Sequence, residues 1–268
     1  MAATLTRGLR ILELLSRHPD GRALSEIAQT LQLPASGAHR LLAELVEQGY
    51  VRQAVDGGDY ALSMKMISQS LTYLSEIDLV DQSKPAIDRL ARASKALVRL
   101  GIVDDGRLIW VLKSQGSTSN ITYDPPVHYD VRLSCSSSGY AWMAHLSDEE
   151  ALTLVLQQGL ESEGYGPNAP RTIDEVLAHV HQARADGYGV ARETYELGIT
   201  SISVAIVDPE LDRVTGALSI AGLSQQVTDE YIAELLPQLK HEAELLGQAR
   251  LDYAKYLVPT KRPKAVAS

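Results

Sequence analysis

The chain has one cysteine, Cys135, among its 268 residues. A lone cysteine forms no intrachain disulfide, which is typical of a protein in a reducing compartment, so we expect a cytoplasmic location. No stretch approaches the roughly 20 apolar residues that cross a bilayer. The opening MAATLTRGLRILELL has charges within its apolar pattern and no small-residue cleavage site, so we also expect no secretory signal.

The motifs of common enzymes are missing as well. The sequence has no Gly-x-Ser-x-Gly elbow, no phosphate-binding loop and no Cys/His cluster with metal-ligand spacing. Cys135 with His128 or His145 is the nucleophile and base that an enzyme interpretation would use. His179 and His181 are two residues apart and do not share one helical face. We therefore expect no catalysis, no metal and no cofactor.

Lysine is absent from the first 63 residues, where six arginines stand against seven acidic residues, a net charge of −1. The rest of the chain therefore carries −8 of the total −9. Phosphate contacts need cations, and arginine suits both phosphates and guanine edges. The first segment is compatible with DNA binding, although a solvated surface of mixed charge would have the same composition.

Helical periodicity and breaks predict three helices in this segment. Leu5, Leu9, Leu12 and Leu15 place an amphipathic helix over 4–17. A short second helix is expected over 24–31, and a third over about 35–48, after Pro34 and before Gly49. Two helices joined by a tight turn, the second longer than the first, form a helix-turn-helix.

A β-hairpin is expected directly after the third helix. Residues 50–55 and 60–62 alternate as strands, and the intervening Asp56-Gly57-Gly58-Asp59 supplies the positive φ angles of a tight turn. A hairpin in this position is a wing. The N-terminal turn of the third helix then enters the major groove. The residues predicted to contact DNA are Arg22, Ser25, Ala35, Ser36, Gly37, His39, Arg40 and Arg52.

Two of these residues have simpler interpretations. His39 alone is more typical of an exposed helical histidine, and Arg40 has Glu44 four residues on, the spacing of a surface ion pair. Only their combination at the start of the third helix favours DNA contact.

The segments LRILELLSRHPDGRALSEIAQTLQL and LPASGAHRLLAELVEQGYV resemble the helix-turn-helix of the IclR family of bacterial regulators. The family's third helix usually starts Pro-Lys-Ser-Thr, whereas Ala35 and Gly37 occupy the lysine and threonine positions here. The resemblance continues through RLSCSSSGYAWMAHLSDEEAL, RADGYGVARETYELGITSISVAIVD and VTGALSIAG. It implies a GAF-like C-terminal domain that binds small carboxylates or aromatic catabolites.

The expected fold class is α+β, with a winged helix-turn-helix, a linker helix and an effector domain built on a mostly antiparallel sheet. The domain limits are 1–63 for the DNA-binding domain, 64–76 for the linker helix, 77–257 for the effector domain and 258–268 for a tail without order. A helix is expected over 78–94, beginning near Lys84 or bending there because of Pro85. Met64 and Met66 are interpreted as core or interface residues.

The effector domain has five predicted strands, 96–103, 107–113, 119–123, 201–207 and 214–221. Capping boxes at Ser147 and Thr172 begin two helices, and Thr228 caps a last helix to about 255. Alternate residues of 201–207 are large and apolar on one face, and small or hydroxylic on the other. A small-residue face accepts either a ligand or a closely packed helix, and the sequence does not decide between them.

Residues matching the family's ligand contacts define the predicted effector site. The amides of Ser137 and Ser138, beside Gly139, are expected at a helix start that would hold a carboxylate. Ala191 replaces a usual acidic residue and Ala221 a usual serine, which suggests a ligand larger or more apolar than pyruvate or glyoxylate, such as an aromatic acid. Tyr140 and Trp142 are either pocket or core aromatics. The predicted set is Tyr123, Ser137, Ser138, Gly139, Ala191, Ser201, Ser219 and Ala221.

The sequence therefore predicts a ligand-responsive DNA-binding regulator, a repressor of a catabolic operon, with operator DNA and a small carboxylate as partners and a homodimer or dimer of dimers as its assembly. The alternatives are a regulator that senses redox state through Cys135, and an enzyme fused to a DNA-binding module.

Overall fold

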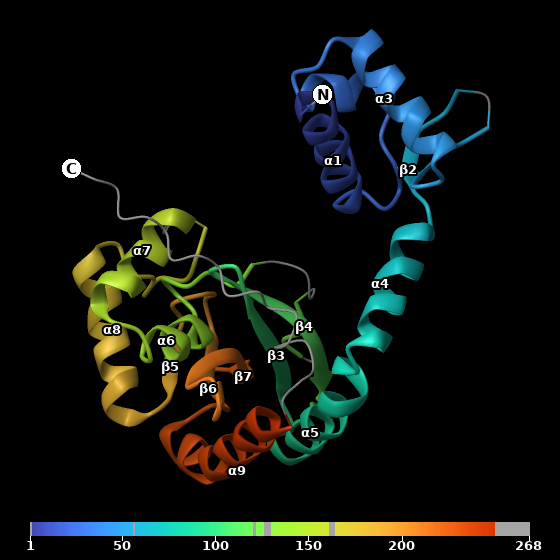
Figure 1. Ribbon diagram of the computed structural model, residues 1–268. Helices are drawn as coiled ribbons and strands as arrows, with labels where there is room; N and C mark the ends of the chain where they lie inside the picture. The colour runs from blue at the N-terminus through green and yellow to red at the C-terminus, as the bar shows by residue number, and fades with distance from the viewer. Residues whose placement is uncertain (1, 56, 120–121, 126–129, 161–163, 250–268) are drawn as a thin grey trace. The chain divides into compact units, whose positions relative to one another are not determined.

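The first three helices form because their apolar side chains share one core. In this computed structural model α1 spans Ala2–Ser16, α2 spans Leu24–Thr30 and α3 spans Ala35–Glu47 (Figure 1). The side chains at their common centre are fully or almost fully buried: Ile11, Leu15, Ile27 and Leu42. The structure describes residues 2–55, 57–119, 122–125, 130–160 and 164–249.

The wing follows α3 as predicted. β1 (Val51–Gln53) pairs antiparallel with β2 (Tyr60–Leu62), and Tyr60 is buried against the helical core. Arg22 forms a further bridge to Tyr60, so the segment before α2 is attached to the wing. A winged helix-turn-helix is thus confirmed. α4 (Lys65–Glu76) completes the first of two compact units, Met1–Glu76; the second is Ile77–Ser268.

The second unit is built on a five-stranded antiparallel sheet. Its strands are β3 (Leu97–Asp104), β4 (Arg107–Gln115), β5 (Gly189–Arg192), β6 (Ile199–Asp208) and β7 (Arg213–Leu223). Their order across the sheet is β4-β3-β7-β6-β5. β3 therefore lies beside β7, which is more than a hundred residues further along the chain.

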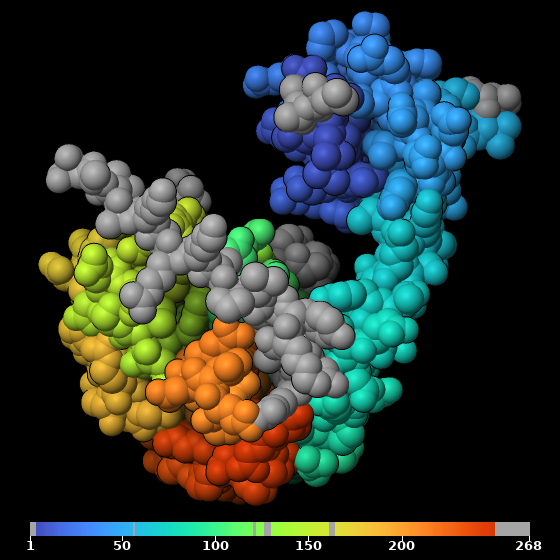
Figure 2. Space-filling view, in the orientation of Figure 1, coloured from blue at the N-terminus to red at the C-terminus, as the bar shows by residue number. Residues whose placement is uncertain are grey.

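Helices cover both faces of this sheet (Figure 1). α5 (Leu79–Ser94) and α9 (Asp229–Gln248) pack against one face and against each other, and both reach the molecular surface in Figure 2. The other face carries α6 (Ser137–Met143) and, beside it, α8 (Ile173–Asp186), with α7 (Asp148–Gln158) packed on α6. The expected mixture of helices and antiparallel sheet is confirmed.

A bidentate ion pair joins the two outer helices. Arg89 of α5 donates from Nε and Nη2 to the two carboxylate oxygens of Glu242 in α9, at 2.9 and 2.8 Å. The Glu242 side chain is only 5% exposed, so removal of Arg89 would leave a buried carboxylate without its partner.

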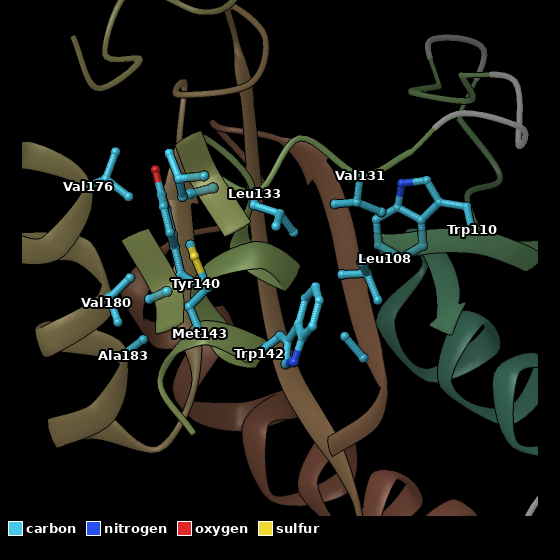
Figure 3. Packing of buried hydrophobic residues seen from close by; sticks show 14 residues of the cluster. Leu108, Trp110, Val131, Leu133, Tyr140, Trp142, Met143, Val176, Val180 and Ala183 are labelled. Atoms are coloured by element: carbon cyan, nitrogen blue, oxygen red, sulfur yellow. The ribbon is translucent and has the colours of Figure 1, made fainter. Parts of the chain in front are cut away.

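The apolar core on the α6 side explains two aromatic residues. Tyr140 and Trp142 are buried in one cluster with side chains of α8 (Figure 3). Tyr140 and Met143 lie toward Val176 and Val180 of α8, while Trp142 lies on the side toward the strands. The Tyr140 hydroxyl donates to the Ser134 carbonyl at 3.0 Å, which satisfies its buried polar end. Both rings are therefore core aromatics.

Three local expectations differ from the structure. The strand predicted over 119–123 is not formed at Ser119, Thr122 or Tyr123, the residues of that segment that the structure describes. In its place side chains of β4 hold this stretch, since Gln115 Nε2 donates to the Tyr123 carbonyl at 2.9 Å. β5 is a strand that the sequence analysis missed. The predicted extension of α9 beyond residue 249, and the tail, lie outside the described residues.

Pro85 neither starts nor ends α5, which begins at Leu79 with Pro85 in its second turn. Proline lacks the N–H that would donate to the Asp81 carbonyl. The buried stripe of this helix, which includes Leu79, Ile87 and Leu90, offsets that loss by packing on the sheet.

None of the helices in the described ranges is both long enough and apolar enough to span a bilayer.

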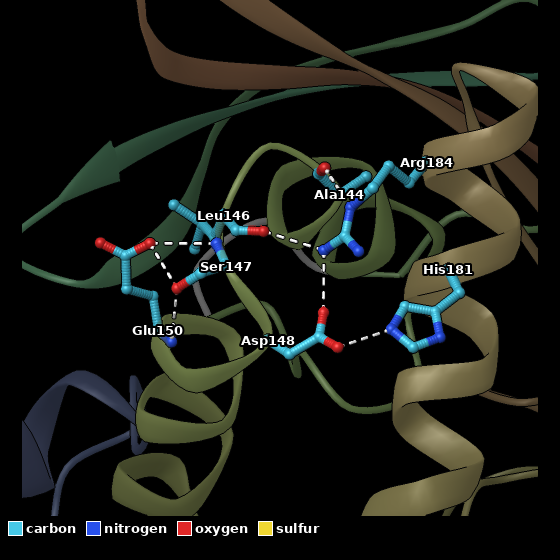
Figure 4. A network of polar contacts seen from close by, with 7 residues as sticks. All are labelled: Ala144, Leu146, Ser147, Asp148, Glu150, His181 and Arg184. Carbon is cyan, nitrogen blue, oxygen red and sulfur yellow. Dashed lines mark hydrogen bonds and ion pairs between the residues drawn. The ribbon is translucent and has the colours of Figure 1, made fainter.

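Asp148 connects α7 to α8 (Figure 4). Its carboxylate accepts from His181 Nε2 at 2.8 Å and from Arg184 Nη2 at 3.0 Å. These bonds, that from His181 first, hold the pKa of Asp148 below its ordinary value of 3.8. A carboxyl whose pKa is lower in the folded protein stabilises the fold above its unfolded-state pKa, and loses that effect as pH falls through the lowered value.

We expect D148N to lower the midpoint of thermal unfolding by about 1–3 °C at pH 7, because this exposed network is screened by solvent. The difference should shrink as the pH falls below 3.8, where the unfolded chain takes up the proton first, and should vanish once the pH has passed the lowered pKa of Asp148 in the folded protein. E149Q is the matched control, since Glu149 lies in the same first turn of α7. An equal loss in E149Q would assign the effect to the helix dipole instead.

Candidate functional site

The small-residue face of the sheet is where α6 packs. Ser137 and Ser201 share a hydrogen bond between their hydroxyl oxygens at 2.8 Å. Ser138 donates to Ser203 at 2.9 Å, and Ser203 donates on to the Leu218 carbonyl at 2.9 Å. The sequence leaves open whether a ligand or a closely packed helix occupies this face. In the structure α6 occupies much of it, and only the remaining part of the face is available to a ligand.

Two glycines allow the backbone of α6 to approach so closely. A Cβ on Gly189 of β5 would lie 2.2 Å from the Ser137 carbonyl oxygen, and one on Gly139 would lie 2.4 Å from the Leu133 carbonyl oxygen. Neither position tolerates a side chain. The Gly139 amide donates to the Ser136 hydroxyl, the N-cap of α6, so it has a partner within the protein.

A small cavity lies beside α6 on the same face of the sheet. It is lined by residues from β3, β4, β5, β6, β7, the start of α6 and the connecting segments: Arg99, Trp110, Tyr123, Val131, Ser136, Ser137, Ala191, Tyr195, Ile199, Ser201 and Ala221. The free space within it is about 10 Å³, room for about one water molecule. Tyr123 and Tyr195 are the half-buried members of this lining, and the others are buried.

Arg99 is the cation of this cavity, and it is only 9% exposed. Its guanidinium carbon lies 4.3 Å from the centroid of the Trp110 ring and 5.9 Å from that of Tyr123. No carboxylate of the described residues forms an ion pair with it, and its Nε–H has no hydrogen-bond acceptor there. Burial lowers the pKa of Arg99, opposed by the Tyr123 hydroxyl, but an arginine remains protonated in a protein.

The backbone positions both rings. Trp110 pairs in register with Gly101, and a Cβ on Gly101 would lie 3.3 Å from the Trp110 ring, so the missing side chain makes room for the indole. Arg99 is two residues from Gly101 on the same face of β3. The main chain at Tyr123 is held by its neighbours: Lys113 Nζ donates to Asp124 at 2.7 Å, and Gln115 donates to the Tyr123 carbonyl.

The tyrosines of the cavity remain neutral hydrogen-bond donors. Burial raises the pKa of Tyr123 to about 12, and burial also raises the pKa of Tyr195. Their hydroxyls therefore keep their protons across the physiological range. The cavity combines a fixed positive charge, neutral hydroxyl donors and aromatic walls, and none of the described residues in its lining is acidic.

Five of the eight predicted effector residues come together in the cavity: Tyr123, Ser137, Ala191, Ser201 and Ala221. Ser138 and Gly139 do not line it, because the first bonds Ser203 and the second packs on Leu133. Ser219 does not line it either, although its buried hydroxyl has no hydrogen-bond partner among the described residues.

Sequence reasoning missed Arg99, Trp110 and Tyr195. A signal was present for the first, since Arg99 is the single charged residue within the apolar run Leu97–Ile102, and a lone charge within a buried strand marks an inward-facing functional group. Trp110 and Tyr195 reach the cavity only through the pairing of β3 with β4 and the turn after β5, which a linear pattern does not reveal.

The catalytic alternative finds little support here. Cys135 is 2% exposed, and burial raises its pKa to about 12, so the thiol stays protonated and unreactive. Burial lowers the pKa of His145, and His128 lies outside the described residues. In the described ranges no three His, Cys, Asp or Glu side chains gather as a metal site would require.

In the first unit the residues predicted to contact DNA are mostly exposed. Ser36, His39 and Arg40 project from the first turns of α3, and Arg52 projects from β1. Within the described part of the chain Arg40 has no acidic partner, so the ion pair with Glu44 is not formed. Arg22, in contrast, is engaged by Glu26 at 3.4 Å and by His18 at 3.3 Å. The others are exposed Ser25 and Ala35 and half-buried Gly37.

Comparison with known proteins agrees with this two-part arrangement. Residues 4–54 match the IclR helix-turn-helix domain, and residues 71–247 match the bacterial transcriptional regulator IclR C-terminal domain. The acetate operon repressor of Salmonella typhimurium is 29% identical over 235 residues, 87% of this chain and 84% of the repressor.

Two solved structures share the fold. The IclR transcriptional regulator of Alicyclobacillus acidocaldarius has a TM-score of 0.79 at 20% identity, with 92% of this chain and 98% of the other covered. An IclR homologue of Microbacterium hydrocarbonoxydans, solved with 4-hydroxybenzoate, has a TM-score of 0.75 at 23% identity, with coverage of 92% and 99%. On both family models and the curated relatives, the chain belongs to the IclR family of bacterial transcriptional regulators.

Proposed function

We propose that this IclR-family regulator is a repressor of a catabolic operon, and that a small organic acid bound in the second unit controls its affinity for operator DNA. The observation that carries the proposal is the cavity beside α6, where residues from five strands and a helix start bring hydroxyl groups and a cation together. Concave sites with a few convergent polar groups are the usual places for small ligands.

Two similarities support the two halves of this function. The acetate operon repressor is a relative that represses a metabolic operon by name. The Microbacterium homologue was crystallised with 4-hydroxybenzoate, an aromatic acid of the class that the small side chains of Ala191 and Ala221 favour.

The first unit supplies the DNA contacts of the proposal. Ser36, His39 and Arg40 occupy the part of a recognition helix that faces base edges in the major groove, and Arg52 on the wing is placed to bind phosphate. Paired copies of the chain would present two recognition helices to half-sites about 34–36 Å apart, or a multiple of that. The acid then acts by favouring one arrangement of the pair over another.

Redox sensing through Cys135 is the second candidate function, and its burial disfavours it. A sensor thiol is exposed and has a lowered pKa, whereas burial raises the pKa of Cys135 to about 12. The Cys135 carbonyl also accepts from Thr194 Oγ1 at 2.6 Å, which fixes this segment within the fold.

We expect R40A to weaken binding to an operator duplex about 10- to 100-fold, the usual loss for a removed base contact. The duplex is obtained by selection from random DNA with the purified wild-type protein, and affinity is measured by fluorescence anisotropy at several salt concentrations. R171A, which removes the same charge from the second unit, is the control. Equal affinity of R40A and R171A would remove Arg40 from the interface.

We expect a small organic acid to raise the unfolding midpoint, because a ligand that binds only the native state stabilises it by mass action. A panel of aliphatic and aromatic acids is tested by thermal shift, and each binder is then added to the operator complex. At saturation the acid should change the footprint or the affinity. A binder that leaves both unchanged at every concentration would refute ligand control.

We expect native Cys135 to remain unmodified by iodoacetamide at pH 8, because a buried thiol with a pKa near 12 has almost no thiolate. The same reagent should label it fully in denaturant, as mass spectrometry would show. Rapid labelling of the folded protein, or loss of ligand response in C135S with folding intact, would favour the redox function.

A further inference from the structure

We propose that Arg99 is the anion receptor of the effector cavity, and that its aromatic surroundings select a planar, aromatic monocarboxylate. This inference rests on the proposed function and specifies its ligand. Its starting observation is a guanidinium that is 9% exposed and lies in a cavity without an acidic partner among the described residues. A buried charge costs stability unless an opposite charge accompanies it.

The nearby acidic groups are not ion-paired to Arg99. Asp124 follows Tyr123 directly, but its carboxylate accepts from Lys113 Nζ at 2.7 Å. Glu196 is exposed and acts on the guanidinium only through space. The positive charge therefore has its rings as neighbours but no counter-ion in the described ranges.

One donor of Arg99, its Nε–H, remains without an acceptor in the described ranges, whereas the Tyr123 hydroxyl acts on the guanidinium. A guanidinium stacked on an aromatic ring still presents its N–H donors in its own plane, where a carboxylate accepts two of them side by side. The indole of Trp110, 4.3 Å from the guanidinium carbon, orients the edge of Arg99 that carries this Nε–H.

A second polar group without a partner in the described residues, the Ser219 hydroxyl, lies beside Arg99. Ser219 of β7 pairs in register with Arg99, so the two side chains project from the same face of the sheet. The Ser219 hydroxyl is buried and has no hydrogen-bond partner in the described residues. Ser219 does not line the cavity, so Arg99 is the group that would receive an anion there, and Ser219 is a second polar atom next to it that is unpartnered in the described ranges.

The rest of the lining determines the shape of the bound molecule. Ala221, Ser201 and Ala191 occupy one register row across β7, β6 and β5, so the sheet beneath the cavity carries only small side chains there. Trp110 and Tyr195 supply aromatic walls, and the Tyr123 ring fills the space between the cavity and the surface. Small side chains on one side and aromatic rings on the other favour a planar body, and the hydroxyls of Ser137 and Ser201 can bond a polar substituent on it.

Entry of such a molecule requires one ring to move. The free space of about 10 Å³ is far too small for an organic acid, and Trp110 is buried. Tyr123 is half-buried, and its ring centroid lies 5.9 Å from the guanidinium carbon. The aromatic acid therefore takes the place of the Tyr123 ring, and its carboxylate reaches the Arg99 edge.

The test compares charge with shape on the full-length protein. Benzoate and 4-hydroxybenzoate are the probes, and benzamide and 4-hydroxybenzamide are their uncharged counterparts. Affinity is measured by calorimetry and by thermal shift for the wild type, R99M, R99K and R132M. Arg132 is the matched control, because it is also 9% exposed and lies 5.4 Å from an aromatic ring, that of Tyr165, but donates to the Gln158 carbonyl and does not line the cavity.

We expect the wild type to bind at least one acid and neither amide. R99M should lose binding of that acid by about 100-fold or more, the loss expected when charge-assisted hydrogen bonds are removed. R99K should recover only part of it, because an ammonium lacks the fork. Without acid, R99M should unfold at the same or a higher temperature than wild type, since it removes an unpaired buried charge. R132M should retain the preference for acid over amide.

Other outcomes would overturn the inference. Unchanged acid binding in R99M, or a lower unfolding midpoint of R99M with acid binding intact, would give Arg99 a structural role only. Binding of the amides as tightly as the acids would remove the charge requirement. If aliphatic acids such as pyruvate bind and alter the operator complex while the aromatic acids do neither, this inference fails and the proposed function stands. If no acid binds or alters that complex, both fail.

Discussion

The close approach of α6 to the sheet is the constraint on which the second unit depends. It is possible because one face of β5, β6 and β7 carries glycine, alanine and serine where other sheets carry bulky side chains. The Ser137 carbonyl oxygen lies so close to the Cα of Gly189 that only a hydrogen fits between them. The serine pairs Ser137–Ser201 and Ser138–Ser203 then fix the helix on the strands and satisfy hydroxyls that burial would otherwise leave unpaired.

The same constraint places the cavity. A short helix covers only part of a five-stranded sheet, and the uncovered part adjoins β3 and β4, where Arg99 and Trp110 lie. Hydroxyl groups at the helix start and the guanidinium on β3 therefore face one enclosed space, although they are far apart in the sequence. The charge is stabilised in part by the rings beside it, which explains how an arginine is accommodated at 9% exposure.

Much of the fold follows from local patterns. The helix-turn-helix and wing depend on apolar spacing, a proline and a glycine-rich turn, and all of these lie within sixty residues. The hydroxylic face of β6 follows from its alternation of Ile202 and Val204 with Ser201 and Ser203. Local patterns do not reveal which strands become neighbours in the sheet. β3 pairs with β7 across more than a hundred residues, and this pairing places Arg99 next to Ser219.

The errors have the same origin. Residues 119–123 alternate like a strand, yet β4 offers side-chain bonds from Gln115 and Lys113 where a strand would need a backbone ladder. β5 is only four residues long, and it forms because β6 provides a partner for it. Ser138 and Ser219 lie at the predicted face of the sheet but do not line the cavity. The alternation of residues along a strand predicts the face, but it does not show which part of that face the helix covers.

The residues that line the cavity come from two separate segments of the gene, and the two segments contribute different kinds of ligand selectivity. The groups that recognise charge, Arg99 and the Trp110 ring beside it, lie on one hairpin, β3–β4, encoded by a short continuous segment. The small side chains and hydroxyl groups of the lining come from α6 and from β5, β6 and β7, all encoded downstream. A recombination point between these segments would exchange the charge preference of one regulator for that of another while leaving the small-residue floor of its pocket in place.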